Sequence, residues 1–102
     1  MQNQPWLTWF VNYDPAPDIA AVRCPVYAAC GDKDCQVISS LNLAGIKAAL
    51  PAGKMNRIVE YPALNHLFQE CATGALEEYR EIEQTISPQF LKDIIEWIIS
   101  LK

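Results

Sequence analysis

The sequence predicts one α/β domain over residues 1–102, a three-layer type of arrangement in which a short parallel sheet of two strands is flanked by helices. The first observation is a continuous apolar run, Val26–Cys30 within CPVYAACG, which is typical of a strand buried on both faces. The second is a β-rich run over 55–61 that Pro62 stops. The third is helical spacing of apolar residues over 38–50. A strand, a crossover helix and a second strand of this length form a right-handed parallel pair.

The chain before the first strand is expected to hold a helix and a connector. Residues 5–13, PWLTWFVNY, are rich in aromatic side chains and begin with proline, which suits the first position of a helix, so they predict a short buried helix. Prolines make 14–22, DPAPDIAAV, a connector. Trp6, Trp9 and Phe10 fit either an acyl or aromatic substrate pocket or packing against the sheet, and packing is the favoured interpretation.

Two more helices are expected after the second strand. Residues 73–85, TGALEEYREIEQT, predict a charged, exposed helix with apolar residues three positions apart. Its glutamates are typical of a solvated face, and we prefer that interpretation to a metal site. Ser87 is a good N-cap and Pro88 suits the next position, so a last helix is expected over 87–102, with an apolar face broader than two strands can cover. The glutamates are Glu77, Glu78, Glu81 and Glu83.

Charge and hydropathy exclude two classes of partner. Acidic residues outnumber basic ones by 12 to 8, and the formal net charge is -4. Because phosphate backbones are bound by basic surfaces, we expect no nucleic-acid partner. The longest apolar run, around 94–101, is interrupted by Glu96 and Ser100 and is too short to span a bilayer, so we expect no membrane partner.

The cysteines do not predict a metal site. They lack paired metal-ligand spacing, and the chain has one histidine. We therefore expect no metal and no cofactor, and we expect free thiols that are mostly buried. The cysteines are Cys24, Cys30, Cys35 and Cys71.

An acidic turn follows the first strand, and the single histidine follows the second. Asp34 lies in GDKDCQ and His66 in YPALNHLFQE. Because the carboxyl ends of parallel strands meet at one edge of a sheet, these side chains are expected to lie together where open α/β sheets bind ligands. A carboxylate that orients an imidazole, and an imidazole that accepts a proton, are two members of a hydrolytic triad. The alternatives are a turn-forming aspartate and a solvated loop histidine.

PVYAACGDKDCQV followed by LNHLFQE resembles the C-terminal part of the α/β-hydrolase fold, in which P-V-L-x-x-x-G-x-x-D carries the triad acid and an N-H segment carries the triad histidine. TGALEEYREIEQTISPQFLKDIIEWI is similar to the tail of an esterase-like or acyl-transfer branch of that family. The resemblance begins near Trp6 and implies the last two strands of that fold, their crossover helix and the terminal helices. It implies Asp34 as the acid, with Asp32 as the weaker candidate. It also implies His66 as the base, with Asn65 shaping its turn.

The nucleophile of that family is absent. It is a serine in G-x-S-x-G that precedes the acid and the histidine. No serine or cysteine in this chain has glycine two positions to each side. The resemblance therefore implies a C-terminal portion of a serine hydrolase for esters, thioesters or small amides, which we expect to be inactive as an isolated chain.

Two alternatives stay open. One is a non-catalytic module that forms homo-oligomers through the unpaired edge of the first strand and the apolar helix faces. The other is an enzyme in which Cys35 or Cys71 acts as the nucleophile beside His66. Asp32 and Asp34 oppose the second alternative because negative charge disfavours a thiolate.

Overall fold

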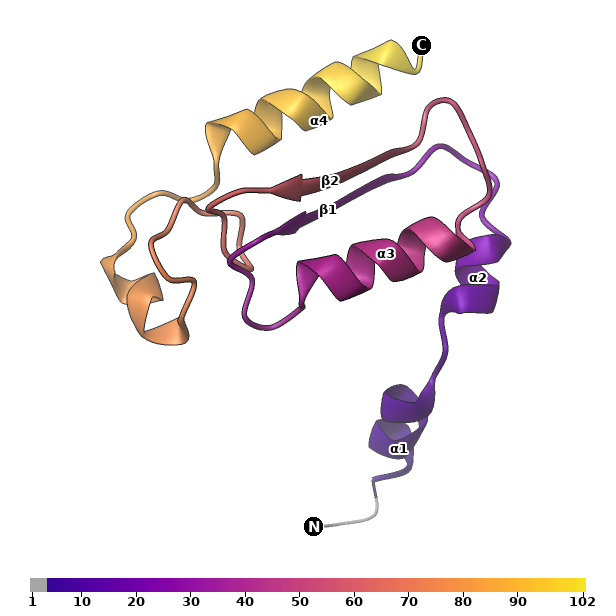
Figure 1. Cartoon of the computed structure of the whole chain (residues 1–102), viewed down its shortest axis with the longest axis horizontal. Coiled ribbons are helices and arrows are strands. Elements are labelled where there is room, and N and C mark those ends of the chain that lie inside the picture. The colour runs from indigo at the N-terminus through magenta and orange to yellow at the C-terminus, as the bar shows by residue number, and fades with distance from the viewer. Residues whose placement is uncertain (1–3) are drawn as a thin grey trace.

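The computed structural model describes residues 4–102 and contains a two-stranded parallel sheet with helices on both sides (Figure 1). β1 (Tyr27–Gly31) and β2 (Arg57–Tyr61) pair in parallel along their whole length. α3 (Ser39–Ala49) connects them. The chain is therefore a mixed α/β structure with the expected order of strand, helix and strand, and β1 is displaced by one residue from the expected 26–30.

α3 covers one face of the sheet through a small apolar cluster. Ala28 and Cys30 of β1 are buried on this face, and Leu43 of α3 packs against them. The partly buried side chains around this cluster are Val26, Val37, Ile46 and Ile58. Because this core lies directly beneath the end of β1, it supports the turn in which Asp34 lies.

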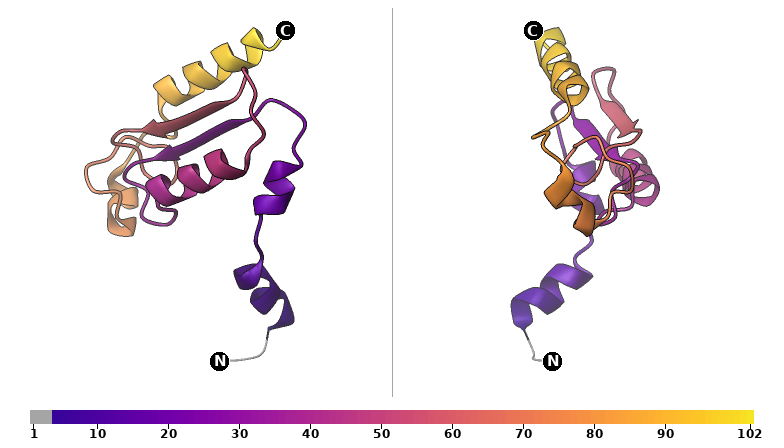
Figure 2. Two further views of the ribbon diagram at one scale, coloured as in Figure 1. Left: turned by 45° about the vertical axis from the view of Figure 1, so that its right-hand side comes forward. Right: turned by 90° about the vertical axis from the view of Figure 1, so that its left-hand side faces the viewer.

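α4 (Pro88–Ser100) lies on the opposite side of the sheet from α3 (Figure 2). Ser87 is its N-cap, as predicted, and its Oγ accepts a hydrogen bond from the backbone N–H of Phe90 at 3.2 Å. The Trp97 ring lies edge-on to Tyr27 of β1. Aromatic contacts of this kind therefore hold α4 against the sheet.

Tyr61, the last residue of β2, joins the sheet to α4 at the carboxyl end of the strand. Its hydroxyl donates a hydrogen bond to Asp93 Oδ2 at 2.7 Å, and its ring lies edge-on to Phe90. Burial raises the pKa of Tyr61, and the neighbouring Tyr27 hydroxyl and Asp93 carboxylate raise it further. Tyr61 is therefore a neutral phenol with a structural role.

The segment before the sheet differs from its prediction. α1 (Pro5–Asn12) is a helix, but none of its residues is buried, and Trp6 and Trp9 are 64% and 63% exposed. The prediction of a buried helix whose aromatic side chains pack on the sheet is wrong, because residues 4–102 provide no second layer beneath α1. α2 (Ala16–Ala20) is a short helix that packs against α3, within the stretch predicted to be only a connector.

The charged segment after the second strand is also less helical than predicted. The regular structure in 73–85 is a single 3-10 helix, η1 (Leu76–Glu81). The Glu78 carboxylate accepts hydrogen bonds from the backbone N–H groups of Ala72 at 2.7 Å and Gly74 at 2.9 Å. These bonds fix a turn before η1, and Leu76 is too exposed to anchor a longer helix by packing.

Candidate functional site

Asp34 lies in the turn between β1 and α3, at the carboxyl edge of the sheet. Its Oδ1 accepts hydrogen bonds from the backbone N–H groups of Gln36 and Val37, both at 2.8 Å. The aspartate therefore does form the turn, as one alternative predicted. These bonds use only one carboxylate oxygen and leave Oδ2 available on the other side.

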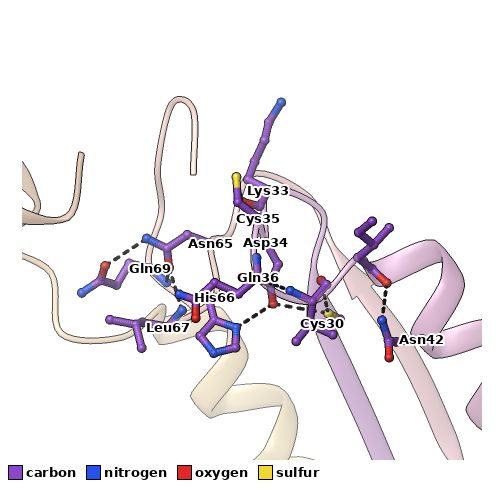
Figure 3. A network of polar contacts seen from close by, with 12 residues as sticks. Cys30, Lys33, Asp34, Cys35, Gln36, Asn42, Asn65, His66, Leu67 and Gln69 are labelled. Carbon is purple, nitrogen blue, oxygen red and sulfur yellow. Dashed lines mark hydrogen bonds and ion pairs between the residues drawn. The ribbon is translucent and has the colours of Figure 1, made fainter. Parts of the chain in front are cut away.

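His66 lies directly across from that second oxygen. Its Nδ1 is 2.9 Å from Asp34 Oδ2, so the structure brings together two residues that are 32 positions apart in the sequence (Figure 3). Because an ionised carboxylate can only accept a hydrogen bond, Nδ1 carries a proton, and in the neutral form of the ring Nε2 is the nitrogen with the lone pair. The His66 side chain is 36% exposed, whereas that of Asp34 is 5% exposed. The buried Asp34 carboxylate therefore orients the imidazole, and part of the ring remains accessible to solvent.

The local bonds keep Asp34 ionised. Burial raises the pKa of Asp34, but hydrogen bonds from the Val37 N–H, the His66 ring and the Gln36 N–H lower it more, and the pKa lies below its ordinary value. At neutral pH the group facing His66 is therefore a carboxylate, which is the form that stabilises an imidazolium.

Asn65 shapes the histidine loop, residues 62–70. Its side chain is fully buried, and its Oδ1 accepts hydrogen bonds from the N–H groups of Leu67 at 2.9 Å and Gln69 at 3.0 Å. Its Nδ2 donates to Gln69 Oε1 at 3.0 Å. This side chain therefore adds to the backbone hydrogen bonds within the loop, such as Asn65 N–H to the Gln69 carbonyl oxygen at 3.0 Å, and helps to fix the backbone next to His66.

Phe68 anchors the histidine loop to α4. Its φ is 59°, a left-handed conformation that costs a residue other than glycine about 1–2 kcal/mol. Its ring stacks on that of Phe90, with centroids 4.0 Å apart, and its carbonyl oxygen accepts a hydrogen bond from the Ser87 N–H at 2.7 Å. These contacts offset the conformational cost. Because they involve the first turn of α4, the histidine loop depends on the position of that helix.

The end of β1 and the histidine loop lie in close contact. A Cβ atom at Gly31 would be 2.1 Å from the Leu64 carbonyl oxygen, so only glycine allows this approach. Lys33 N–H donates to that same oxygen at 3.0 Å. Asp32, the weaker candidate acid, accepts a hydrogen bond from the Ala63 N–H at 2.7 Å. Asp32 therefore holds the backbone of the loop, and Asp34 is the carboxylate that reaches the imidazole.

The thiols differ from their prediction, and none of them is hydrogen-bonded to the imidazole. All four cysteines are free, but only Cys30 is buried, so the expectation of mostly buried thiols is wrong. Cys35 is exposed, and Cys71 Sγ donates to the Ala63 carbonyl oxygen at 3.5 Å. Burial, followed by the charge of Glu78, raises the pKa of Cys71. The environment of Cys71 therefore opposes a thiolate nucleophile.

Sequence reasoning missed the contact between Cys30 and Asp34. Cys30 Sγ lies 3.6 Å from Asp34 Oδ2, the oxygen that also meets His66 (Figure 3). The sequence held no signal for this contact, because it depends on how the turn that holds Asp34 folds back over the end of β1, on the face that α3 covers.

Neither a metal centre nor a membrane span is found in the described part of the chain. Residues 4–102 contain no group of three or more histidine, cysteine, aspartate or glutamate side chains able to hold a metal ion. No helix in this range is long and apolar enough to cross a bilayer. A hollow of about 270 Å³ lies at the opposite end of the strands from His66, between the segments 22–25 and 50–56.

Comparison of the chain with protein-family models, curated proteins and solved structures gives no match.

Proposed function

We propose that Asp34 and His66 are the acid and the general base of a serine-hydrolase relay whose nucleophile is supplied by polypeptide outside these 102 residues. The observation that carries the proposal is the 2.9 Å contact between Asp34 Oδ2 and His66 Nδ1 at the carboxyl edge of a parallel sheet. In such a relay His66 Nε2 removes the proton of the attacking hydroxyl and later delivers it to the leaving group. The Asp34 carboxylate stabilises the imidazolium between these steps.

Three features of the site suit this role. Asp34 is ionised and almost completely buried, His66 is partly exposed, and separate sets of hydrogen bonds fix the acid turn and the histidine loop. The order of the motifs, G-x-x-D and then N-H, is that of the α/β-hydrolase fold. By that resemblance the substrates are esters, thioesters or small amides, and the reaction is transfer of an acyl group to water.

Three of the four serines of this chain are engaged in hydrogen bonds away from the site. Ser39 Oγ donates a hydrogen bond to the Glu60 carboxylate, and Ser87 Oγ caps α4. Ser100 Oγ donates to the Trp97 carbonyl oxygen at 2.6 Å. None of these three hydroxyl groups is hydrogen-bonded to His66, and no serine of the chain lies in a G-x-S-x-G segment.

The test begins with the coding frame upstream of Met1, which is expected to contain G-x-S-x-G. The longer polypeptide is then expressed, and an active-site fluorophosphonate is expected to label that serine. Asp34→Asn in the longer polypeptide should lower hydrolysis of p-nitrophenyl butyrate by about three to four orders of magnitude, because the amide favours the wrong tautomer of the imidazole. His66→Ala should abolish labelling.

Asp32→Asn is the matched control, since it makes the same change of charge two residues away and leaves an oxygen to accept the Ala63 N–H. It should hydrolyse the ester at nearly the wild-type rate. An upstream frame without the elbow, or ester turnover by the 102-residue chain that disappears in His66→Ala, would overturn the proposal.

A second candidate function, a self-associating module, is favoured by the amount of exposed surface. The chain exposes 7520 Å², whereas a compact monomer of this size exposes about 5,800 Å². The difference is larger than the roughly 800 Å² that each partner buries in an ordinary interface. The large apolar side chains exposed on α4 are Leu91, Ile95, Ile98 and Ile99.

A further inference from the structure

The Cys30 thiol lies next to the Asp34 carboxylate, and the proposed relay has no role for it. Cys30 Sγ lies 3.6 Å from Asp34 Oδ2 and 3.6 Å from the Val37 carbonyl oxygen. Cys30 is buried, with 6% of its surface exposed, and it belongs to β1, whereas both acceptors belong to the turn before α3. The thiol therefore joins the rigid strand to the turn that presents the acid.

We propose that Cys30 is a positioning residue of the site, whose thiol donates a hydrogen bond to Asp34 Oδ2 and holds this oxygen toward His66. The inference deepens the proposed function and, for its role in catalysis, rests on it. Cys30 acts through Asp34 and is not expected to touch the substrate.

The environment keeps Cys30 in the form that can donate. Burial raises the pKa of Cys30, and the charge of Asp34 raises it further, so the group is a thiol and not a thiolate. A protonated thiol beside an ionised carboxylate can only be the donor of the pair. The S–H group is a weak donor, but an acceptor that carries a full charge strengthens the bond.

Both oxygens of Asp34 are then held by donors on two sides. Oδ1 accepts hydrogen bonds from the N–H groups of Gln36 and Val37. Oδ2 accepts hydrogen bonds from the Cys30 thiol and from His66 Nδ1. The carboxylate is therefore unable to rotate about its terminal bond without losing bonds at both oxygens. The thiol also reduces the negative charge on Oδ2, the oxygen that accepts the hydrogen bond from His66.

The experiment uses the 102-residue chain and nuclear magnetic resonance. The pKa of Asp34 is measured from its Cγ resonance, and the bond to His66 from the resonance of the Nδ1 proton. Cys30→Ala should raise the pKa of Asp34, because the carboxylate loses a hydrogen-bond donor. It should also move the Nδ1 proton of His66 downfield, because His66 is then the remaining donor to Oδ2 and its hydrogen bond becomes stronger. Cys30→Ser, which keeps a donor, should return both signals toward wild type.

Cys71→Ala is the matched control, because that thiol bonds to the Ala63 carbonyl oxygen and not to Asp34. It should leave both signals unchanged. The proposal is wrong if Cys30→Ala leaves both signals unchanged, or if Cys30→Ser behaves like Cys30→Ala.

A second measurement does not depend on folding of the alanine variant. In a chain whose other three cysteines are changed to alanine, the infrared S–H stretch of Cys30 should lie at the low frequency of a hydrogen-bonded thiol. It should move upward when Asp34→Asn removes the charge of the acceptor, and an unmoved band would contradict the proposal. None of these signals requires turnover, so they can fail while serine labelling of the longer polypeptide succeeds, and the reverse also holds.

Discussion

At the scale of single residues, Asp34 combines a structural and a chemical role. One of its oxygens forms the turn after β1 and the other faces His66, so neither the turn-forming nor the acid interpretation excludes the other. The two residues were predictable because a strand end and the polar residues after it are local features of the sequence. The contact with Cys30 was not, because it depends on how the turn folds back onto the strand.

The lowered pKa of Asp34 predicts how stability depends on pH. The folded pKa lies below the unfolded value of about 3.9. The unfolded state therefore binds the proton more tightly, and the stabilisation is present above the unfolded value and lost as the pH falls through the folded one. We expect urea unfolding of the wild type to show a free energy of unfolding that falls as the pH drops below about 5 and continues to fall until Asp34 is protonated in the folded state.

Asp34→Asn should flatten that pH dependence and lower stability at neutral pH. Asp32→Asn is again the control, and it should retain a slope close to that of the wild type. Equal slopes for Asp34→Asn and the wild type would show that this carboxylate does not stabilise the folded state.

At the scale of elements, the contact between the end of β1 and the histidine loop determines whether the acid and the imidazole meet. Gly31→Ala places a methyl group 2.1 Å from the Leu64 carbonyl oxygen, which is backbone and cannot rotate away. We expect destabilisation by about 3 kcal/mol, measured by urea unfolding. We also expect loss of the Nδ1 proton signal of His66, because the loop must move away from Asp34.

Gly45→Ala is the matched control, since a Cβ atom at Gly45, within α3, meets nothing within 4 Å. It should stabilise the chain by about 0.5–1 kcal/mol, because alanine favours the helix. A folded Gly31→Ala variant with wild-type stability and an unchanged His66 signal would contradict the described approach of loop and strand.

The elements that the sequence predicted correctly are those whose signal is local. Helical spacing defined α3, a serine followed by proline defined the start of α4, and continuous apolarity defined β1. The burial of α1 was predicted wrongly, because an aromatic helix is buried only if another layer covers it. The length of η1 was overestimated, because the Glu78 side chain binds the backbone N–H groups of Ala72 and Gly74 and so fixes a turn before η1.

At the scale of the whole molecule, the chain is extended for its length. Its radius of gyration is 15.9 Å, whereas a compact domain of about 100 residues has a radius near 13 Å. Among residues 4–102 the buried apolar residues are few, and they are Ala28, Cys30, Leu43, Tyr61 and Leu64. A core of this size leaves a sheet edge and much of α4 uncovered, which both proposed functions explain by further protein that covers them.

Self-association of the 102-residue chain through α4 is the prediction that belongs to this scale. Ile95 and Ile98 are about half exposed and lie three positions apart, so they share one face of the helix. Burying a large apolar side chain contributes about 1.5–3 kcal/mol. We therefore expect a dimer or larger assembly in analytical ultracentrifugation, and the double variant Ile95→Lys with Ile98→Lys should weaken it by at least about a hundredfold. Leu76→Lys on η1 is the control and should leave the assembly intact. A wild-type chain that stays monomeric at high concentration would reject the self-associating module and leave α4 to be covered by the polypeptide that carries the nucleophile.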